Sequence, residues 1–302
     1  MSGAPAAGPH GGDAHAVAAW LGRPVDDVLD LSASLNPFAP DVAAEVARAA
    51  SLVHHYPDPS AAANALADAI GVDPDRLVLT NGGSEAIALV AGLLGAGWVE
   101  RPEFALYERH LARVSPDAGR WRSNPSNPMG RLAPPGSVAR VWDEAFYPLA
   151  TGRWTRGDDD AWRLGSLTKL WACPGLRIGY VVAPSAALAQ AVRDRQPRWS
   201  VNGLASAVVE ALLPATDLGG WVGGIAVLRR RLLAGLRERG LVVHDTDACW
   251  LLVERSDLRR LLAPHGVLVR DCTSFGLPHL TRLAVPGDQA RDRLFAALDR
   301  VL

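Results

Sequence analysis

The sequence predicts an α/β fold in which a large domain, with a mostly parallel mixed sheet between helices, is joined to a smaller α+β domain. The segment "RLVLTNGGSEAIALVAGLLG" at 76–95 has the pattern of a strand, a glycine turn and a helix in succession. Apolar strands alternate with loops and helices as far as residue 200, and two long helical stretches, short strands and a last helix follow. We therefore expect the large domain over 36–200 and the small domain over 1–35 together with 201–302.

Short helices are expected ahead of the first strand of the large domain. One begins at Asp13 and ends at Gly22, because Asp favours a helix start and Gly a helix end. The loop "SASLNPFAP" follows at 32–40, and two amphipathic helices lie between 41 and 71. The two prolines of "HHYPDPS" forbid a continuous helix there, and Ser60 is expected to cap the second helix.

The later elements follow from apolar runs that are bounded by turns. The interval 100–138 is rich in proline and has little periodicity. Strands are expected in "ARVWDEAF" at 139–146, "AWRLGSLTK" at 161–169, "RIGYVVAP" at 177–184, "WLLVE" at 250–254, "GVLVR" at 266–270 and "LTRLAV" at 280–285. Helices are expected over 201–213, 217–239 and 287–302.

Composition and charge exclude several classes of function. A formal net charge of -1 over 302 residues gives no basic excess for nucleic acid. The longest apolar runs, such as 86–99, are shorter than the roughly 20 residues of a membrane span, and the N-terminus lacks a basic region followed by an apolar core, so we expect a cytoplasmic protein. The three cysteines are far apart and lack metal-ligand spacing, so no structural metal is expected.

Lys169 is the only lysine in the chain, and the other basic residues, histidines apart, are all arginines. A guanidinium stays protonated and cannot attack a carbonyl, so the single lysine is a candidate for amine chemistry. Ser166 and Arg177 lie nearby in sequence and supply a hydroxyl and a bidentate cation, which together suit a phosphate. An amine nucleophile beside a phosphate site describes pyridoxal phosphate held as a Schiff base. The alternative is a surface lysine beside a loop.

The segment "SLTKLWACPGLRIGY" at 166–180 resembles the active-site lysine segment of the fold-type I aminotransferases, which depend on pyridoxal phosphate. The serine stands three residues before the lysine and the arginine eight residues after it, as in that family. The resemblance covers nearly the whole chain and implies a pyridoxal phosphate-dependent transferase fold of type I. It implies that Lys169 holds the cofactor and that Ser166 and Arg177 bind the cofactor phosphate.

Two further stretches are consistent with this resemblance. A pyridinium nitrogen stays protonated beside a carboxylate, and Asp143 ends an apolar strand in "DEAF", which resembles the corresponding segment of the family. Glu144 is the alternative partner, and taken alone Asp143 is an acid that ends a strand. In "TNGGSEAI", Gly83 and Ser84 begin a helix whose free N–H groups favour an anion, and in the family this turn closes over the cofactor phosphate.

Other residues receive roles from the resemblance alone. "NPSNPMG" is similar to the family's Asn-Pro-x-Asn-Pro-Thr-Gly, with Met129 in place of Thr, and makes Asn127 the donor to the pyridine 3-oxygen. "RPEFALY" implies that Phe104 stacks on the ring. "HHYPDP" implies that Tyr56 reaches the phosphate site of a neighbouring subunit in a homodimer. "HLTRLAV" implies that Arg282 binds the substrate α-carboxylate.

Two branches of the family fit the sequence, the threonine-phosphate decarboxylases of cobalamin biosynthesis and the histidinol-phosphate aminotransferases. "HGGDAHAVAAWLG", "DVLDLSASLNPFAP", "QPRWSVNGLA" and "LVRDC" resemble the decarboxylase branch, as does Phe146 where the aminotransferases usually have tyrosine. Both branches imply a small, phosphorylated substrate. His10, Arg270 and Asn36 are our candidates for its second anion site.

Three hypotheses of function therefore stay open: a decarboxylase, an aminotransferase, and a non-catalytic protein that binds the cofactor. The intervals from Tyr107 to Asn124 and from Gly130 to Asp143 are short compared with the family. They leave room for only part of the usual strand and helix, so the large domain is expected to be shortened.

Overall fold

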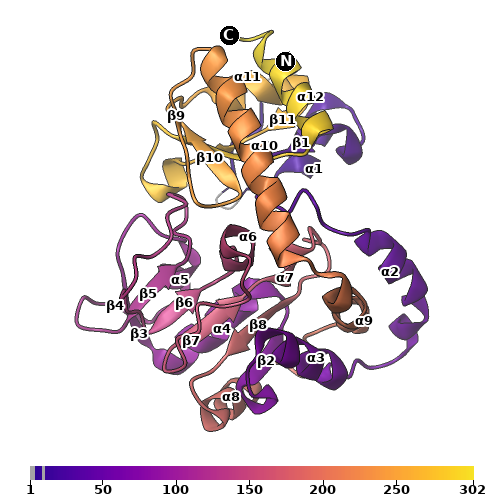
Figure 1. Ribbon diagram of the computed structural model, residues 1–302, viewed down its shortest axis with the longest axis vertical. Helices are drawn as coiled ribbons and strands as arrows, with labels where there is room; N and C mark the ends of the chain where they lie inside the picture. Colours follow the sequence, from indigo (N-terminus) through magenta and orange to yellow (C-terminus); the bar gives the residue numbers. More distant parts are fainter. Residues whose placement is uncertain (1–3, 9–10) are drawn as a thin grey trace.

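A computed structural model describes residues 4–8 and 11–302 and contains a larger and a smaller body, joined by the long helix α10 (Leu218–Glu238) (Figure 1). The other helices, by label, are α1 (Ala14–Leu21), α2 (Val42–Arg48), α3 (Ser60–Ile70), α4 (Gly82–Leu94), α5 (Leu106–His110), α6 (Tyr147–Thr151), α7 (Leu167–Leu170), α8 (Ala186–Arg193), α9 (Gly203–Leu212), α11 (Leu258–Leu262) and α12 (Asp288–Leu298).

A sheet of seven strands organises the larger body, in the order β2-β8-β7-β6-β5-β3-β4. Strand β8 runs antiparallel to both of its neighbours, and the strands from β7 to β4 pair in parallel. The predicted mostly parallel mixed sheet is thus confirmed. Its strands are β2 (Leu77–Thr80), β3 (Ala96–Val99), β4 (Arg113–Val114), β5 (Arg120–Ser123), β6 (Val141–Asp143), β7 (Trp162–Gly165) and β8 (Gly179–Val182).

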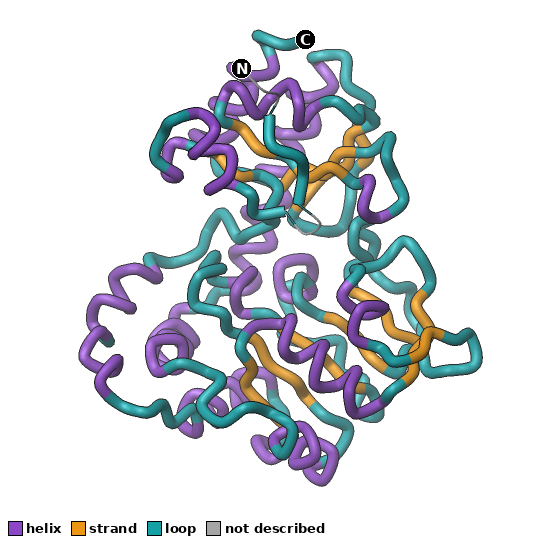
Figure 2. The backbone as a smooth tube through the Cα atoms, turned by 180° about the vertical axis from the view of Figure 1, so that it is seen from behind, coloured by secondary structure: helices purple, strands orange, loops and turns teal. Residues whose placement is uncertain are grey.

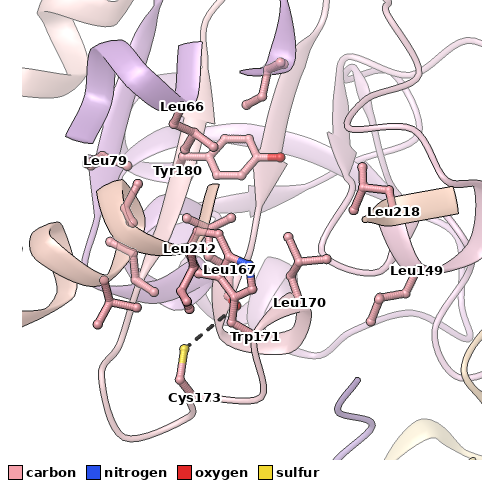
Figure 3. Close-up of a cluster of buried hydrophobic side chains, with 14 of the residues drawn as sticks. Leu66, Leu79, Leu149, Leu167, Leu170, Trp171, Cys173, Tyr180, Leu212 and Leu218 are labelled. Atoms are coloured by element: carbon pink, nitrogen blue, oxygen red, sulfur yellow. Dashed lines mark hydrogen bonds between the residues drawn. The ribbon is translucent and has the colours of Figure 1, made fainter. Parts of the chain in front are cut away.

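Helices cover both faces of this sheet because its strands alternate side chains between two apolar cores. Leu79 and Tyr180 pack on one face against α3 and α9, and Figure 3 shows this cluster with Leu66 and Leu212. Val181 packs on the opposite face, in the cluster formed by α4, α5 and α8. The sheet is therefore enclosed where β2 and β8 lie.

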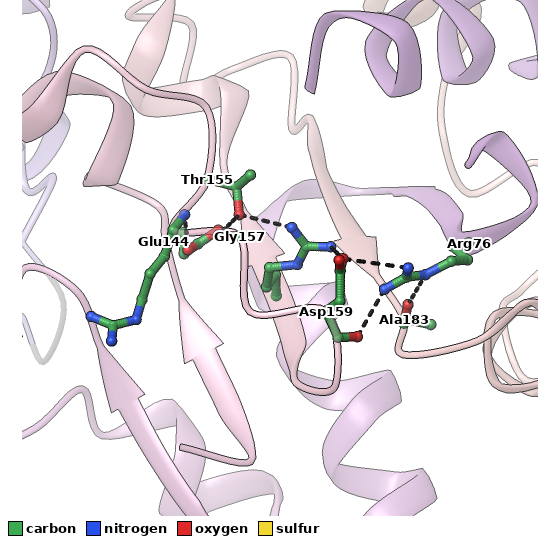
Figure 4. A network of polar contacts seen from close by, with 8 residues as sticks. Arg76, Glu144, Thr155, Gly157, Asp159 and Ala183 are labelled. Carbon is green, nitrogen blue, oxygen red and sulfur yellow. Dashed lines mark hydrogen bonds and ion pairs between the residues drawn. The ribbon is translucent and has the colours of Figure 1, made fainter. Parts of the chain in front are cut away.

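A network of polar contacts, centred on the buried Arg163 and Glu144, covers part of the first face near β6 and β7 (Figure 4). The guanidinium of Arg163 donates to Thr155 Oγ1 at 3.1 Å and to Asp159 at 3.2 Å. Arg76 donates to the carbonyls of Asp159 and Ala183, and the Glu144 carboxyl accepts the N–H of Arg156 at 2.8 Å. These contacts hold the loop 153–160 against the two central strands.

The smaller body combines the N-terminal elements α1 and β1 with the C-terminal part of the chain (Figure 1 and Figure 2). Its sheet has the order β12-β13-β10-β9, with every pairing antiparallel. The N-terminal strand β1 (Leu29–Asp30) pairs in parallel with β11 (Val267–Leu268), and α1 packs on Ala263 and Leu268. The remaining strands are β9 (Val243–His244), β10 (Trp250–Val253), β12 (Arg270–Asp271) and β13 (Thr281–Ala284).

The two hydrophobic cores meet along α10. Trp221 and Ile225 belong to the core of the larger body, whereas Leu228 and Leu232 belong to that of the smaller one. Helix α9 packs wholly in the larger core. The predicted boundary between the two domains at residue 200 stays a prediction. The hydrophobic packing changes from the core of the larger body to that of the smaller one within α10, about one helix after residue 200.

Two local expectations differ from the structure. Ser60 does not cap α3: Pro59 occupies that position, and Ser60 donates its N–H and hydroxyl to Asp58. The short intervals retain strands β4, β5 and β6, but the connection over 124–140 contains no helix. Trp142 is covered instead by the guanidinium of Arg156, 4.6 Å from its ring centroid. Both intervals therefore contribute strands to the large sheet, whereas the shortening of the large domain stays a prediction.

Over residues 4–8 and 11–302, no single helix has the length and apolar composition needed to cross a membrane. Only a pair bent by 84°, Gly203–Ala215 with Leu218–Glu238, meets that test when its two parts are taken together.

Candidate active site

The candidate site lies where the parallel strands of the large sheet end. The ends of β2, β5, β6 and β7 lead into Gly83, Asn127, Asp143 and Lys169, and Arg177 precedes the antiparallel β8. Because parallel strands place their carboxyl ends at one edge of a sheet, segments far apart in sequence meet there. A cavity of about 220 Å³ opens at this edge.

Ten of the predicted site residues line this one cavity. They are Gly83, Ser84, Phe104, Asn127, Asp143, Ser166, Lys169, Arg177, Arg270 and Arg282. The sequence-based grouping of these residues in one cavity agrees with the geometry, whereas their individual roles stay predictions.

Two predicted residues, Tyr56 and Asn36, do not line the cavity. Tyr56 is 80% exposed and stacks on Trp199, with ring centroids 4.5 Å apart. Asn36 is buried and donates its side-chain N–H to the carbonyl of Leu170, while its backbone N–H donates to the carbonyl of Lys169. Asn36 thus stabilises the backbone of the turn that carries Lys169. His10 lies outside the described residues.

The phosphate end of the cavity is formed by the start of α4. The Asn81 side chain makes no capping hydrogen bond within the described chain, which leaves the first N–H groups of α4 available for an anion. Gly82 has φ +76°, and a Cβ atom built on it would lie 2.5 Å from Nη2 of Arg177. Only glycine therefore lets the guanidinium approach the helix start.

Lys169 supplies the amine of the site from the short helix α7. Burial, followed by the nearby charge of Arg282, lowers the pKa of Lys169 to about 8. Its Nζ lies 5.9 Å from the centroid of the Phe146 ring. A substantial fraction of this amine is therefore neutral, and nucleophilic, at mildly alkaline pH.

Asp143 ends β6 with both carboxylate oxygens engaged. Oδ2 accepts the hydroxyl of Tyr107 at 2.7 Å, and Oδ1 accepts the N–H of Ala145 at 3.0 Å. Burial raises the pKa of Asp143, and these two donors act in the opposite direction by favouring its charged form. A cationic ring nitrogen in the cavity would complete the environment of this carboxylate.

Asn127 and Arg282 face each other across the two bodies. Arg282 Nη1 donates to Asn127 Oδ1 at 2.6 Å, so the amide N–H groups of Asn127 stay available as donors. Arg282 Nη2 also donates to the carbonyl of Ser32 at 3.2 Å. Burial lowers the pKa of Arg282 to about 10, and the guanidinium is still protonated near neutral pH.

Arg270 forms a second buried cationic group beside Arg282. The two residues are direct partners on the antiparallel strands β12 and β13, and both line the cavity. Arg270 donates to the carbonyl of Gly8 at 2.7 Å and to Ser274 Oγ at 2.8 Å. Its guanidinium lies 5.3 Å from the ring of Phe275, a further wall of the cavity.

The sequence did not single out several residues of the site. Tyr107 and Ser123 belong to the environment of Asp143 and Asn127, and Phe275 lines the cavity together with Phe104. Tyr107 lies in "RPEFALY" at the start of α5, but no spacing in that segment indicates its contact with Asp143. No sequence pattern marks Phe275.

The residues present fit pyridoxal phosphate. A free helix start and a guanidinium suit its phosphate, a carboxylate suits its ring nitrogen, and a neutral amine suits its aldehyde. Gly82 opens the space that the phosphate site needs.

Comparisons with known proteins agree with the family resemblance that the sequence showed. A family model described as aminotransferase class I and II matches residues 121–298. The chain is 29% identical to a threonine-phosphate decarboxylase of Salmonella typhimurium, over 97% of this chain and 96% of that protein. It is 31% identical to a histidinol-phosphate aminotransferase of Methylococcus capsulatus, over 91% of this chain and 90% of that protein.

Solved structures share the fold. A histidinol-phosphate aminotransferase from Sinorhizobium meliloti in complex with pyridoxal-5'-phosphate aligns with a TM-score of 0.82 at 22% identity, over 98% of this chain and 95% of that one. An L-threonine-O-3-phosphate decarboxylase from Porphyromonas gingivalis aligns with a TM-score of 0.76 at 21% identity, over 90% of this chain and 99% of that one. The predicted fold class is confirmed.

Covalent attachment of pyridoxal phosphate is expected to follow the titration of Lys169. Because burial lowers the lysine pKa to about 8, the attachment rate should rise with pH and level off above this value. Stopped-flow absorbance of the apo chain mixed with the cofactor measures this rate. After borohydride reduction, mass spectrometry should find the label on Lys169 and none on a Lys169→Ala chain. Labelling of that variant would assign the attachment to the N-terminal amine.

Asp143→Asn is expected to keep the cofactor but to lower turnover by about 100-fold or more, because the neutral amide no longer stabilises a protonated ring nitrogen. Glu144→Gln is the matched control, since Glu144 is buried next in sequence and contacts the backbone of Arg156. Steady-state rates and the cofactor absorbance would be compared for both. Equal losses in the two variants would contradict the role of Asp143.

Proposed function

Since the chain belongs to the aminotransferase class I and II family, we propose that it is a pyridoxal phosphate-dependent enzyme that decarboxylates a small phosphorylated amino acid of the threonine phosphate type. The observation that supports this most is the pair of buried arginines, Arg270 and Arg282, directly opposed on adjacent strands in the cavity that holds Lys169.

Two adjacent guanidinium groups suit a substrate with two anionic groups. Arg282, next to Asn127, is placed for the α-carboxylate, and Arg270 for the phosphate. Threonine phosphate has both groups and an amine between them. Histidinol phosphate has the phosphate but no carboxylate, so it would use one guanidinium only. His10 and Asn36 stay predictions as further ligands of the substrate phosphate.

Different residues of the cavity would bind different parts of the cofactor. Ser166, Arg177 and the N–H groups of Gly83 and Ser84 would bind its phosphate. Asp143 would pair with the ring nitrogen, Asn127 would donate to the ring oxygen, and Phe104 would cover one ring face. When bound, the cofactor supplies an electron-withdrawing ring joined to the substrate amine.

Lys169 is placed to move the proton that the reaction requires. Loss of the carboxylate as CO2 leaves an electron pair on Cα, and one proton must be added there to give aminopropanol phosphate. With a pKa lowered to about 8, the Lys169 ammonium gives up a proton more readily than an ordinary lysine. Arg282 orients the carboxylate, which determines the bond at Cα that is broken.

An aminotransferase that acts on histidinol phosphate or another amino acid is the second candidate. The 31% identity to the Methylococcus capsulatus aminotransferase favours it, whereas Phe146, which has no hydroxyl, and the N-terminal segment led us to the decarboxylase. A non-catalytic protein is the weaker hypothesis, because such a protein has no need of Lys169, Asp143 and Arg282 in one cavity. The cobalamin pathway and the cytoplasmic location stay predictions.

A homodimer is part of this proposal, and the exposure of apolar groups on the larger body supports it. Tyr56 is 80% exposed, Val53 64% and Trp199 55%, and Tyr56 stacks on Trp199. Large side chains exposed together are typical of a protein interface. A second copy seated there would cover them and would receive Tyr56 at its phosphate site, the role that the resemblance implies.

The decarboxylase proposal predicts many turnovers of CO2 when the cofactor-loaded enzyme receives threonine phosphate without a keto acid. Released CO2 and the cofactor spectrum would be recorded together. Arg270→Gln should raise the KM at least tenfold, because a charge-assisted contact to phosphate is lost. A single conversion of the cofactor to its amine form, without CO2, would replace the proposal by the aminotransferase.

Tyr56→Phe is expected to leave the dimer intact and to weaken cofactor binding about tenfold, since only one hydroxyl contact to the phosphate is removed. Sedimentation equilibrium gives the mass, and titration of the apo enzyme gives the cofactor affinity. A monomer at every concentration, or an unchanged affinity, would remove Tyr56 from this role.

A further inference from the structure

A second buried carboxyl group lies beside the cofactor end of the cavity and has no part in the assignments above. Glu103 lies between β3 and α5 and is 9% exposed. It does not line the main cavity. It borders a smaller cavity of about 100 Å³ that lies behind Phe104, which borders both.

The carboxyl group of Glu103 accepts three hydrogen bonds. Oε1 accepts the N–H of Ser123 at 2.9 Å, and Oε2 accepts the Ser123 hydroxyl at 2.5 Å. Oε2 also accepts the N–H of Phe104 at 3.2 Å. The two contacts to Ser123 are buried, where a donor left without an acceptor is destabilising. Glu103 therefore fixes the backbone of Phe104 and both groups of Ser123.

Ser123 links Glu103 to Asn127 by hydrogen bonds. Its Oγ, which donates to Glu103, accepts the backbone N–H of Asn127 at 2.8 Å. The hydroxyl is thereby held in one rotamer, because it acts as donor and acceptor at once. Ser123 also pairs in register with Asp143 on the adjacent strand.

We infer that Glu103 is a positioning residue for the cofactor ring: through its own contacts and through Ser123 it fixes the residue that covers the ring face, Phe104, and the residue that contacts the ring oxygen, Asn127. The inference rests on the proposed cofactor site and adds to it a side chain that does not touch the cofactor. No other described acid makes contact with both Phe104 and Ser123.

The charged and titratable groups around Glu103 are Asp143, Tyr107 and Arg122. Burial raises the pKa of Glu103 to about 8, and the negative charge of Asp143 adds to this effect. At pH 7 the group is therefore mainly a neutral acid, which glutamine matches in shape and charge. Gln can accept the N–H of Ser123 through its amide oxygen and donate from its NH2 group to Ser123 Oγ, whereas Leu can do neither.

The test compares Glu103→Gln and Glu103→Leu in the apo protein titrated with pyridoxal phosphate at pH 7. Tryptophan quenching gives the dissociation constant, and circular dichroism in the cofactor's absorption band reports how uniquely the ring is held. We expect Glu103→Gln to bind within about threefold of the wild type. We expect Glu103→Leu to bind at least tenfold more weakly, which corresponds to about 1.4 kcal/mol, with a reduced band.

Two controls separate positioning from a general loss of stability. Glu144→Gln changes a buried acid whose carboxyl contacts lie on the opposite face of the sheet, and it should leave affinity and band unchanged. Ser123→Ala should reproduce the Leu variant, and the double variant should lose no more than the worse single one, since both act through one path.

Each outcome then has one meaning. If the wild-type chain takes up no cofactor, the proposed function itself fails. If the wild type binds and Glu103→Leu matches it within twofold, with the same dichroism band, the positioning role is refuted and the proposed function stands. A loss of equal size in Glu144→Gln refutes the role as well, because the effect would then follow from destabilisation.

Discussion

The register of strands β5, β6 and β7 is the constraint on which the site depends. Ser123 pairs with Asp143, and Asp143 with Leu164, so three segments that are 20 residues or more apart in sequence end at one level. A slip of one residue would turn the Asp143 side chain to the other face of the sheet. The apolar alternation of the strands, with Val141 in one core and Trp142 in another, opposes such a slip.

The charges of the cavity are divided between its two ends. Arg270 and Arg282 enter from the smaller body, whereas Asp143 and Arg177 lie on the larger one. Both the burial of Lys169 and the charge of Arg282 lower the pKa of its amine. Since the arginines require anions and Asp143 a cationic ring nitrogen, one orientation of a cofactor with its substrate is favoured.

Local sequence patterns predicted the parts of the site that short segments determine. The lysine turn, the glycine turn of α4 and the end of β6 each place one or two side chains at a strand end, and all of them line the cavity. Contacts between distant segments were not visible in the sequence. Asn36 binds the backbone of the lysine turn 134 positions further along the chain, and Glu103 binds Ser123 over 20 positions. The sequence around Asn36 or Glu103 does not indicate which distant residue it will contact, because only the folded chain brings these segments together.

The connection between β5 and β6, which contains no helix, leaves the site intact for a geometric reason. Successive residues of a strand point to opposite faces, so Trp142 and Glu144 lie on the face opposite to Asp143. Trp142 is covered there by the guanidinium of Arg156. Asp143 instead shares its face with Val141, in the core beneath α4 and α5. Met129, a departure from the family pattern, packs with Phe275 against a separate apolar cluster and does not line the cavity. Phe146, where the aminotransferases usually have tyrosine, does line it, with its ring centroid 5.9 Å from Nζ of Lys169. Of these two departures, Phe146 is therefore the one that changes the wall beside the amine.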